Sequence, residues 1–511
     1  MKKTFLFVLA AVLTASAAFA APRGEEMRVG VAIDAKNFDP HNSVDTFSFS
    51  MQKQIYEPLF VLDGNAKEPA PMLAESYEML DDCTYKIHLR QGVKFHNGEE
   101  LTAEDVVYSY KRLIDPKRCV VAKTKGADID PDGFEIIDKY TVIIRTKGPI
   151  GGWVSSMKPF QMIFNKKAVE EAGDDYFRNP VGTGPYKFVK WTKGEKVELE
   201  AFDDYWGVKP YAKKLTFYVI PDNSSRIIAL ETGKLDMSYA VPSADYDRVV
   251  SEGKVKVVKV RGPILLHLAM NMDSPKLQDV RVRKAIDAAI SKEAYCQVVY
   301  NGNATPGVGP LPTASTWLPE DPVKWDYNPE LAKKLLAEAG VKDLELNLIV
   351  MNAADRIDGA TVLQSMLGQV GIKVNIEVYE NAVVNDKVRN DPSSYDMYCA
   401  TWGMQNSHDA GVYWTGSIQS VAVGSTNNAR FSDAEVDELV YKANRTIDEK
   451  ARGELFQKVW DRVNDLHPWV YLCQADELHG AQKDLIGVED LLDGKINLLS
   501  NLHYPEQERL K

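Results

Sequence analysis

Residues 344–378 read LELNLIVMNAADRIDGATVLQSMLGQVGIKVNIEV. Apolar residues recur at every second position in two places, at Leu344, Leu346, Leu348 and Val350, and again at Ile372, Val374, Ile376 and Val378. This period of two predicts two strands, and the residues between them, from about 360 to 370, predict a helix that ends before Gly371. A strand, a helix and a strand in this order predict a right-handed βαβ unit with parallel strands.

Similar signals occur along the whole chain. Tyr85, Ile87 and Leu89 alternate with polar neighbours and predict a strand. Capping boxes at residues 102–105 and 432–435 each predict the start of a helix. Asn328 and Pro329 predict another helix start, and Gly340 predicts the end of that helix. The sequence therefore predicts an α/β fold, with helices on both faces of its sheets.

Composition and charge limit the possible functions. The chain has 511 residues, which corresponds to roughly two to four domains of ordinary size. Apolar residues make up 45%, as in an ordinary globular protein. The formal net charge of −12 argues against binding to nucleic acid or to anionic membranes, because both require basic surfaces.

The N-terminus has the features of a secretory leader. Lys2 and Lys3 precede an apolar run at residues 5–13, and Ala18-Phe19-Ala20 supplies the small residues that a signal peptidase requires. We expect residues 1–20 to be a cleaved signal peptide. No Cys follows the leader, so we expect no lipid anchor, and no later stretch reaches about 20 apolar residues. The mature protein is expected to be soluble and located in a periplasm.

The cysteines and the known catalytic motifs give no sign of chemistry. Five cysteines permit at most two disulfides with an open pairing, and none lies in a CxxC motif: Cys83, Cys119, Cys296, Cys399 and Cys473. The chain also lacks a GxSxG elbow, an HExxH motif and a Walker motif. We therefore expect neither an enzyme nor a zinc protein.

Six segments in a fixed order carry a resemblance to a known family. They are FDPH at 38–41, YEPL at 56–59, VKFHNG at 93–98, LTAEDV at 101–106, PVGTGPY at 180–186 and DVRVRKAI at 279–286. They resemble the extracellular solute-binding proteins of family 5, the peptide and nickel transporter class that includes the dipeptide- and oligopeptide-binding proteins. The similarity extends over nearly all of the chain that follows the leader.

The resemblance implies a two-lobed periplasmic-binding-protein fold of type II with an extra inserted domain. The first lobe would comprise residues 21–60, 173–263 and 476–511, with the inserted domain at 61–172 on its flank. Residues 264–475 would form the second lobe. Two crossings, near residues 262–271 and 474–478, would then form a hinge, and a ligand would lie between the lobes.

The resemblance also implies a function. The protein would be the substrate-binding component of an ABC importer, and would deliver a small solute to a permease in the inner membrane. A short peptide or a modified amino-acid compound is the first expectation; a sugar, an opine-like conjugate and a metal chelate are alternatives, as is a role as chaperone or sensor. The resemblance implies no cofactor and a monomer.

Ligand contacts in this family come from a few segments. The resemblance implies that the ligand-binding residues here are Asp45, Thr46, Phe47, Tyr239, His267, Trp402, Gln405 and Asp409. Val44, directly before Asp45, belongs to the first of these segments. Trp402 matches a Trp of the peptide binders, which carry an Asp three residues later for the peptide ammonium. Gln405 stands there instead and supplies no charge. Cys399 also replaces an Arg of the oligopeptide binders, and Asp409 is the nearest acid.

Other prominent residues have simpler interpretations. His96 is expected to form hydrogen bonds within a turn rather than to bind a metal, and Gly182 and Gly184 to hold positive φ angles rather than a phosphate. Arg281 and Arg283 are expected to form ion pairs. Lys123 and Lys125 could meet an anionic ligand group, and Tyr413 and Trp414 could add aromatic cover to the ligand.

Overall fold

The computed structural model describes residues 24–43, 45–62, 69–120, 122, 126–154, 161–313, 315–322, 325–403, 409–489 and 498–510. Residues 1–20, expected to be the signal peptide, lie outside these ranges. Most strands form one eleven-stranded sheet of order β15-β14-β16-β12-β17-β11-β1-β10-β9-β8, with β13 paired to β17. The helices and this sheet confirm the expected α/β class.

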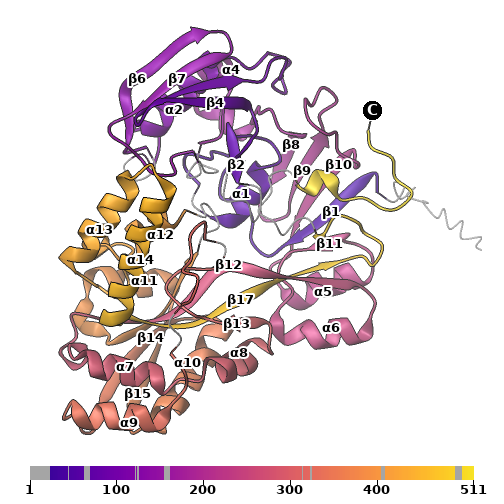
Figure 1. The fold of residues 1–511 in the computed structure, drawn as a ribbon. Helices are drawn as coiled ribbons and strands as arrows, with labels where there is room; N and C mark the ends of the chain where they lie inside the picture. Colours follow the sequence, from indigo (N-terminus) through magenta and orange to yellow (C-terminus); the bar gives the residue numbers. More distant parts are fainter. Residues whose placement is uncertain are drawn as a thin grey trace, which may run out of the picture.

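Two long antiparallel strands, β12 (Lys256–Met270) and β17 (Trp469–Ala481), cross the middle of this sheet (Figure 1). On one side lie the strands of the first lobe, β1 (Glu26–Val31), β8 (Tyr186–Thr192), β9 (Lys196–Ala201), β10 (Lys214–Val219) and β11 (Met237–Ser238). On the other side lie those of the second lobe, β13 (Ala304–Pro306), β14 (Glu345–Met351), β15 (Lys373–Tyr379) and β16 (Met397–Gly403). The fold is therefore two-lobed, whereas the exact domain boundaries stay a prediction.

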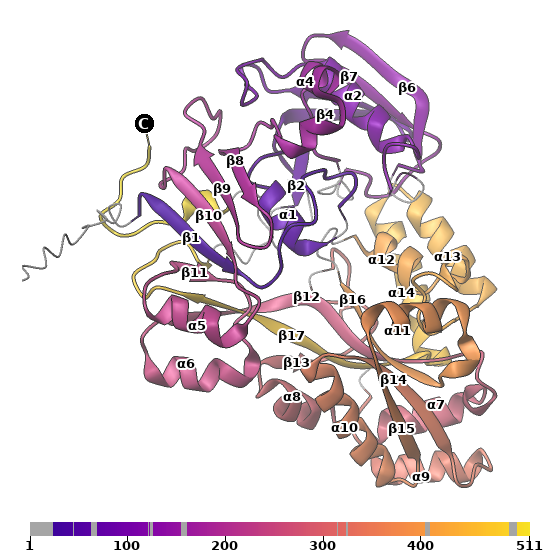
Figure 2. The same ribbon diagram turned by 180° about the vertical axis from the view of Figure 1, so that it is seen from behind.

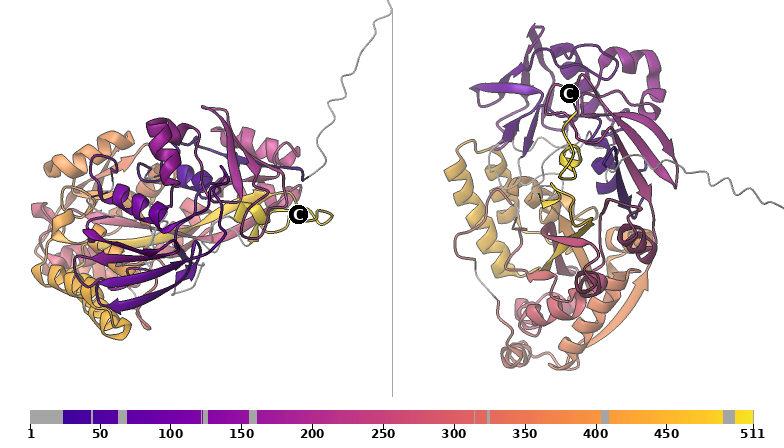
Figure 3. Two further views of the ribbon diagram at one scale, coloured as in Figure 1. Left: turned by 90° about the horizontal axis from the view of Figure 1, so that it is seen from above. Right: turned by 90° about the vertical axis from the view of Figure 1, so that its right-hand side faces the viewer.

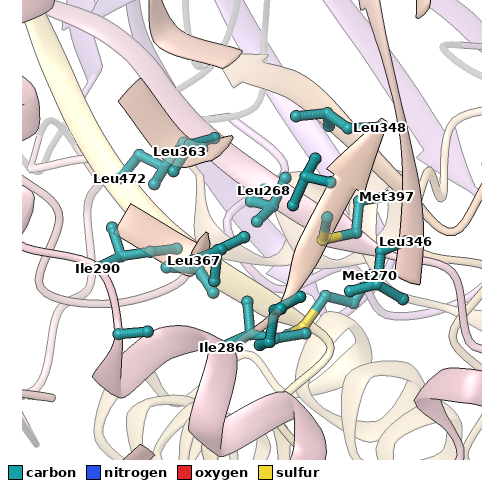
Figure 4. Packing of buried hydrophobic residues seen from close by; sticks show 14 of the residues in the cluster. Leu268, Met270, Ile286, Ile290, Leu346, Leu348, Leu363, Leu367, Met397 and Leu472 are labelled. Atoms are coloured by element: carbon teal, nitrogen blue, oxygen red, sulfur yellow. The ribbon is translucent and has the colours of Figure 1, made fainter. Parts of the chain in front are cut away.

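The βαβ unit is confirmed. β14 pairs in parallel with β15, with Leu346 opposite Val374 and Leu348 opposite Ile376. The connecting helix α10 (Ala354–Gly368) begins earlier than the sequence predicted. Its Leu363 and Leu367 pack on the sheet together with Leu268 (Figure 4).

Helices cover both faces of the sheet in the second lobe. Alternate residues of β12 face opposite ways, since Leu266 and Leu268 pack in one core and Leu265 and Ala269 in another. The first core is covered by α7 (Val280–Ala288), α8 (Lys292–Tyr300), α9 (Pro329–Glu338) and α10. The second is covered by α11 (Asn381–Asn390), α12 (Ala410–Ser417), α13 (Ala434–Arg445) and α14 (Glu449–Leu466). In Figure 2 the second group, α11 to α14, lies above the first group, α7 to α10.

The first lobe carries its own helices. In Figure 1, α5 (Asn223–Glu231) and α6 (Tyr246–Glu252) lie below β11, and α1 (Thr46–Gln52) lies beside β8 and β9. The short hairpin of β2 (Phe60–Leu62) and β3 (Pro69–Pro71) follows α1.

A separate four-stranded antiparallel sheet of order β4-β5-β7-β6 forms a unit at the top of the molecule (Figure 3). We call it the β4–β7 unit: β4 (Ala74–Asp81), β5 (Thr84–Leu89), β6 (Ile129–Asp138), β7 (Thr141–Thr146), with α2 (Ala103–Ile114) and α4 (Lys166–Ala172). The expected strand at 85–89 lies within β5. The expected capping box also forms, because Asp105 accepts a hydrogen bond from the Thr102 amide at 2.9 Å.

A buried ion pair ties the β4–β7 unit to the first lobe. Arg112 of α2 donates two hydrogen bonds to Asp39, at 3.0 and 2.6 Å, and both side chains are less than a tenth exposed. Asp39 belongs to the FDPH segment, so this segment has a structural role. Val120 strengthens the junction, since its amide donates to Asn42 Oδ1 at 3.0 Å.

Two local predictions are wrong. α13 is capped by Asp433, which accepts from the Val436 amide, and not by Ser432. Gly182 and Gly184 have no positive φ angle. Glycine is required there because a Cβ would lie 1.9 Å from the Ile55 carbonyl oxygen at Gly182, and 2.6 Å from the Gln54 oxygen at Gly184. By contrast, Asn328 caps α9 and Gly340 follows its end with φ +69°, as predicted.

Within the described ranges, no helix combines the length and the apolar character that a membrane span would need.

Replacing Arg112 by Met is expected to lower the free energy of unfolding by about 3–5 kcal/mol, because it leaves Asp39 buried without its partner. The measurement is urea denaturation. Arg178→Met is the control, since Arg178 pairs with Asp175 at the surface with 81% and 71% of the side chains exposed. It should cost less than about 0.5 kcal/mol. Equal losses in the two variants would contradict a structural role for the Arg112 pair.

Candidate functional site

Strand direction locates the candidate site. β1, β10, β11 and the first half of β12 run in one direction, toward the register shift in β12 between Arg261 and Leu265. β14, β15 and β16 run the opposite way, toward the same point from the second lobe. The carboxyl ends of both sets of strands therefore face each other across the hinge. Ligands of open α/β sheets bind at carboxyl ends of strands.

The hinge itself is a discontinuity in the β12–β17 pairing. Residues 256–261 pair with 476–481 in the first lobe, and residues 265–269 pair with 469–474 in the second. Gln474 bridges the discontinuity: its Nε2 donates to the Gly262 carbonyl, and its Oε1 accepts from Thr313 Oγ1 at 3.0 Å. Both expected crossings thus lie in the adjacent strands β12 and β17. The short segment at the register shift is therefore the place about which the two lobes can rotate.

The first predicted segment forms a helix start. Asp45 caps α1, because its carboxylate accepts from the Ser48 amide and the Ser48 hydroxyl, both at 2.9 Å. Thr46 opens α1, but its side chain lies outside the described part of the chain, as does Val44. Phe47 is half-buried against the core of the first lobe. The carboxylate of Asp45 is therefore already hydrogen-bonded by its own helix.

Tyr239 lies directly after β11, at the carboxyl end of the first-lobe sheet. Its amide donates to the Gly30 carbonyl at 3.0 Å, and its ring contacts the edge of His479 with 5.2 Å between centroids. Burial raises the pKa of Tyr239, and the negative charge of Glu477 raises it further. Tyr239 therefore borders the hinge strand β17.

Lys53 and Glu477 bring opposite charges to the same place. Lys53 follows the end of α1 and is half-buried; burial lowers its pKa, and Glu477 opposes that effect. Glu477 of β17 keeps 48% of its side chain exposed and lies 3.5 Å from His479 Nε2. Glu477 lies on the hinge strand β17, and its charge raises the pKa values of both Lys53 and Tyr239.

His267 is inside the second lobe. Only 1% of the residue is exposed, and its ring lies 4.8 Å from that of Trp469. Burial lowers the pKa of His267 to about 3, so the imidazole is neutral at ordinary pH. Contact with a ligand at His267 stays a prediction, and in this structure the ring packs in the core.

Trp402 is at the carboxyl end of β16, opposite Leu265 of the hinge strand. It is half-buried and packs closely on Gly416 of α12, where a Cβ would lie 2.6 Å from the indole. Tyr413 contacts it edge-on at 6.0 Å, whereas Trp414 is fully buried. Tyr413 therefore supports Trp402 from within the lobe, and Trp414 packs edge-on against Tyr413. Gln405, like Lys123 and Lys125, lies outside the described residues.

Asp409 has a partner inside the protein. It caps α12 by accepting from the Val412 amide at 3.1 Å. It also pairs with Arg452 of α14 at 2.9 Å, and 3% of each side chain is exposed. This carboxylate is thus neutralised by a buried guanidinium. Cys399, at the position of the family's Arg, is buried in the opposite core, where burial raises the pKa of its thiol to about 12.

The motif residues are mostly structural. His96 donates from Nε2 to the Gly184 carbonyl at 2.9 Å and accepts at Nδ1 from the Gly182 amide at 3.2 Å. It is a hydrogen-bonded turn residue, as predicted. Arg281 forms the expected surface ion pair with Asp279 at 2.6 Å.

The prediction of an ion pair for Arg283 is wrong. Arg283 is buried and donates to backbone carbonyls, including those of Leu466 and His467 at the end of α14. The unpaired carbonyls of a helix end attract such a donor. Burial lowers its pKa to about 10.

No group of His, Cys, Asp and Glu suited to a metal ion occurs within the described part of the chain. All five thiols are unbridged in this structure.

A family model for bacterial extracellular solute-binding proteins, family 5, matches residues 68–421. The chain belongs to this family. It is a substrate-binding protein of the ABC importer class, and its relatives agree with that assignment. It is 27% identical over 513 residues to Di/tripeptide-binding protein 2 of Pseudomonas aeruginosa, with 93% of this chain and 95% of the relative covered. It is 28% identical over 492 residues to the glutathione-binding protein GsiB of Pectobacterium atrosepticum, with 93% of each covered.

The solved structures give the same result. The periplasmic binding protein DppA of Helicobacter pylori, in complex with the peptide STSA, superposes with a TM-score of 0.80 at 25% identity, with 94% of this chain and 98% of that chain covered. CtaP of Listeria monocytogenes has the same fold, with a TM-score of 0.85 at 24% identity, and 94% and 99% of the two chains are covered.

Lys53 and Glu477 were not among the residues selected from the sequence of this family member. Lys53 precedes the YEPL segment and Glu477 lies within a predicted hinge crossing, but neither stands out as a motif. Their proximity results from folding across 424 residues, which no local pattern reveals.

The neutral state of His267 predicts a pH dependence of stability. Its pKa is lowered in the folded protein, so the unfolded chain takes up the proton first as the pH falls below about 6.5. The free energy of unfolding should therefore fall between about pH 6.5 and 5, by up to about 1.4 kcal/mol per pH unit from this residue. In His267→Phe the decline, measured by urea denaturation, should be correspondingly shallower. An unchanged slope would contradict the buried, neutral assignment.

Proposed function

We propose that this protein is exported through its N-terminal leader and captures a small peptide-like zwitterion between its two lobes. Membership of family 5 and the convergence of strand ends at the hinge support this. A ligand that touches both lobes stabilises the closed form, because only that form contacts it from both sides. The protein then presents its ligand to an inner-membrane permease, unchanged and without catalysis. It acts as a monomer, and its acidic charge gives it no affinity for nucleic acid.

The partly buried side chain of Lys53 is the main reason for this choice of ligand. Its ammonium has no hydrogen bond or ion pair within the part of the chain that the structure describes, although burial lowers its pKa. A partly desolvated cation that no carboxylate contacts directly is costly. A ligand carboxylate removes that cost, so Lys53 selects compounds that carry one.

Glu477 supplies the complementary charge. The loop after β16 offers Gln405 where peptide binders have an Asp, and Asp409 is paired with Arg452. A ligand ammonium therefore has no free carboxylate from Asp409. The half-exposed Glu477, on the hinge strand beside Lys53, takes this role in our proposal. The two charges together favour a short peptide or a modified amino-acid compound.

Aromatic side chains complete the proposed site. Tyr239 contributes a ring from the first lobe, and Trp402 contributes one from the second. Apolar and aromatic walls with a few placed polar groups are the usual composition of small-molecule sites. We propose that the two rings cover the apolar part of the ligand when the lobes close.

Isothermal titration calorimetry with reduced glutathione and with trialanine tests this proposal. Lys53→Met should weaken binding by about 30-fold or more, which is the loss that follows removal of one partner of a buried charge pair. Lys190→Met, at an exposed lysine of β8, is the matched control and should bind as the wild type does.

Two results would contradict the proposal. If both probes leave the wild-type protein unaffected, the ligand class is wrong. If Lys53→Met binds as tightly as Lys190→Met, the cation does not recognise the ligand.

A further inference from the structure

A tight turn of the β4–β7 unit contacts the helices of the second lobe. The turn comprises Ile150, Gly151, Gly152 and Trp153, and the Trp153 amide donates to the Ile150 carbonyl at 3.3 Å. The Gly151 amide points outward and donates to the Asn444 carbonyl at 2.9 Å. Asn444 is in the last turn of α13, so the hydrogen bond crosses between the two lobes.

The glycines allow an approach that other residues would prevent. A Cβ at Gly151 would lie 2.3 Å from the Thr446 carbonyl oxygen, and a Cβ at Gly152 would lie 2.7 Å from Arg452 Nη1. Gly152 has φ +67°, a conformation that glycine adopts without strain. The backbone of the turn therefore lies directly on the second lobe, with no side chain between them.

The turn docks on the end of α13, where backbone carbonyls require hydrogen-bond donors from outside the helix. The last carbonyls of a helix lack donors within that helix, and Asn444 and Thr446 are at the end of α13. Beneath them Arg452 donates to the Ala443 carbonyl at 3.2 Å and pairs with Asp409, the cap of α12. The turn thus covers a helix end and an ion pair that would meet water if the lobes separated.

The turn is firmly held on its own side. Trp153 is 5% exposed and packs against Tyr85 of β5 with 4.2 Å between ring centroids. It belongs to the core of the β4–β7 unit, which Arg112 attaches to the first lobe. Figures 1 and 2 both show α12 and α13 directly below this unit. The turn moves with the first lobe and meets the second lobe away from the hinge.

We propose that the turn at 150–153 is a latch that docks on the end of α13 and on the Arg452–Asp409 pair when the lobes close. The contact stabilises the closed form independently of any ligand, and so raises the fraction of protein that is able to hold one. It also gives Asp409 a role in closure in place of the ligand contact that the family resemblance implied. This inference goes beyond the proposed function and does not depend on the identity of the ligand.

Hydrogen exchange on the full-length mature protein without ligand tests the latch. The variant is Gly151→Ala, whose methyl group would collide with the Thr446 carbonyl. Gly148→Ala is the matched control, because a Cβ at Gly148 has nothing within 4 Å and the residue has no positive φ angle. Gly152 is left unchanged, since its positive φ angle would add strain to any replacement. Thermal unfolding of both variants verifies that they fold.

In the wild type and in Gly148→Ala, we expect the amides of residues 149–154 to be protected. In Gly151→Ala, exchange there should be roughly five- to ten-fold faster, as the loss of one hydrogen bond and its packing implies. X-ray scattering should show a larger radius of gyration for the same variant. The latch is overturned if residues 149–154 of the wild type exchange without protection, or if Gly151→Ala and Gly148→Ala exchange alike. Either result leaves the ligand proposal intact, because no ligand is used.

Discussion

The antiparallel pairing of β12 with β17 holds both lobes together and fixes where they can move. One half of the pair belongs to the sheet of each lobe, and the register changes between Arg261 and Leu265. Since β1, β10 and β11 run toward that point from the first lobe and β14, β15 and β16 from the second, their carboxyl ends and the loops after them meet at the hinge. The position of the ligand site and the axis of closure therefore both follow from the same two strands.

Buried charges separate structural residues from those available to a ligand. Arg112 with Asp39 and Arg452 with Asp409 are closed pairs, in which each charge is compensated inside the protein. Removing one partner of such a pair is costly, so these residues are poorly suited to a role that requires exchange of partners. Lys53 forms no ion pair with a residue in the described part of the chain, although the charge of Glu477 on the hinge strand opposes the effect of its burial. A binding protein needs charged groups of this kind, because the ligand then supplies the opposite charge.

Local patterns predicted the secondary structure well where alternation and caps were strong. The strands on either side of α10 and the caps Thr102 and Asn328 are examples. The start of α10 was missed because its first residues, Ala354 to Gly359, show no clear apolar period. The Ser432 box failed because Asp433, one position later, caps the same helix. Pairings such as β11 with β17 join distant segments, and no local pattern identifies such partners.

The candidate site was harder to predict than the fold. Resemblance selected Trp402 and Tyr239, which lie at strand ends near the hinge, but it also selected His267, which is buried, and Asp409, whose partner Arg452 is 43 residues away. Burial and pairing of this kind depend on tertiary packing. For the same reason, no sequence pattern indicated Lys53 and Glu477. The motif glycines Gly182 and Gly184 are sites of close backbone contact.

In our proposal, the two lobes hold a small compound with a carboxylate between them. The decisive experiment is native mass spectrometry of the protein purified from its own cells, followed by denaturation and identification of the bound compound. We predict one bound molecule per chain, of the size of a short peptide or a modified amino acid, with a free carboxylate. A bound sugar without a carboxylate, a bare metal ion or a protein that is always empty would rule out this ligand class.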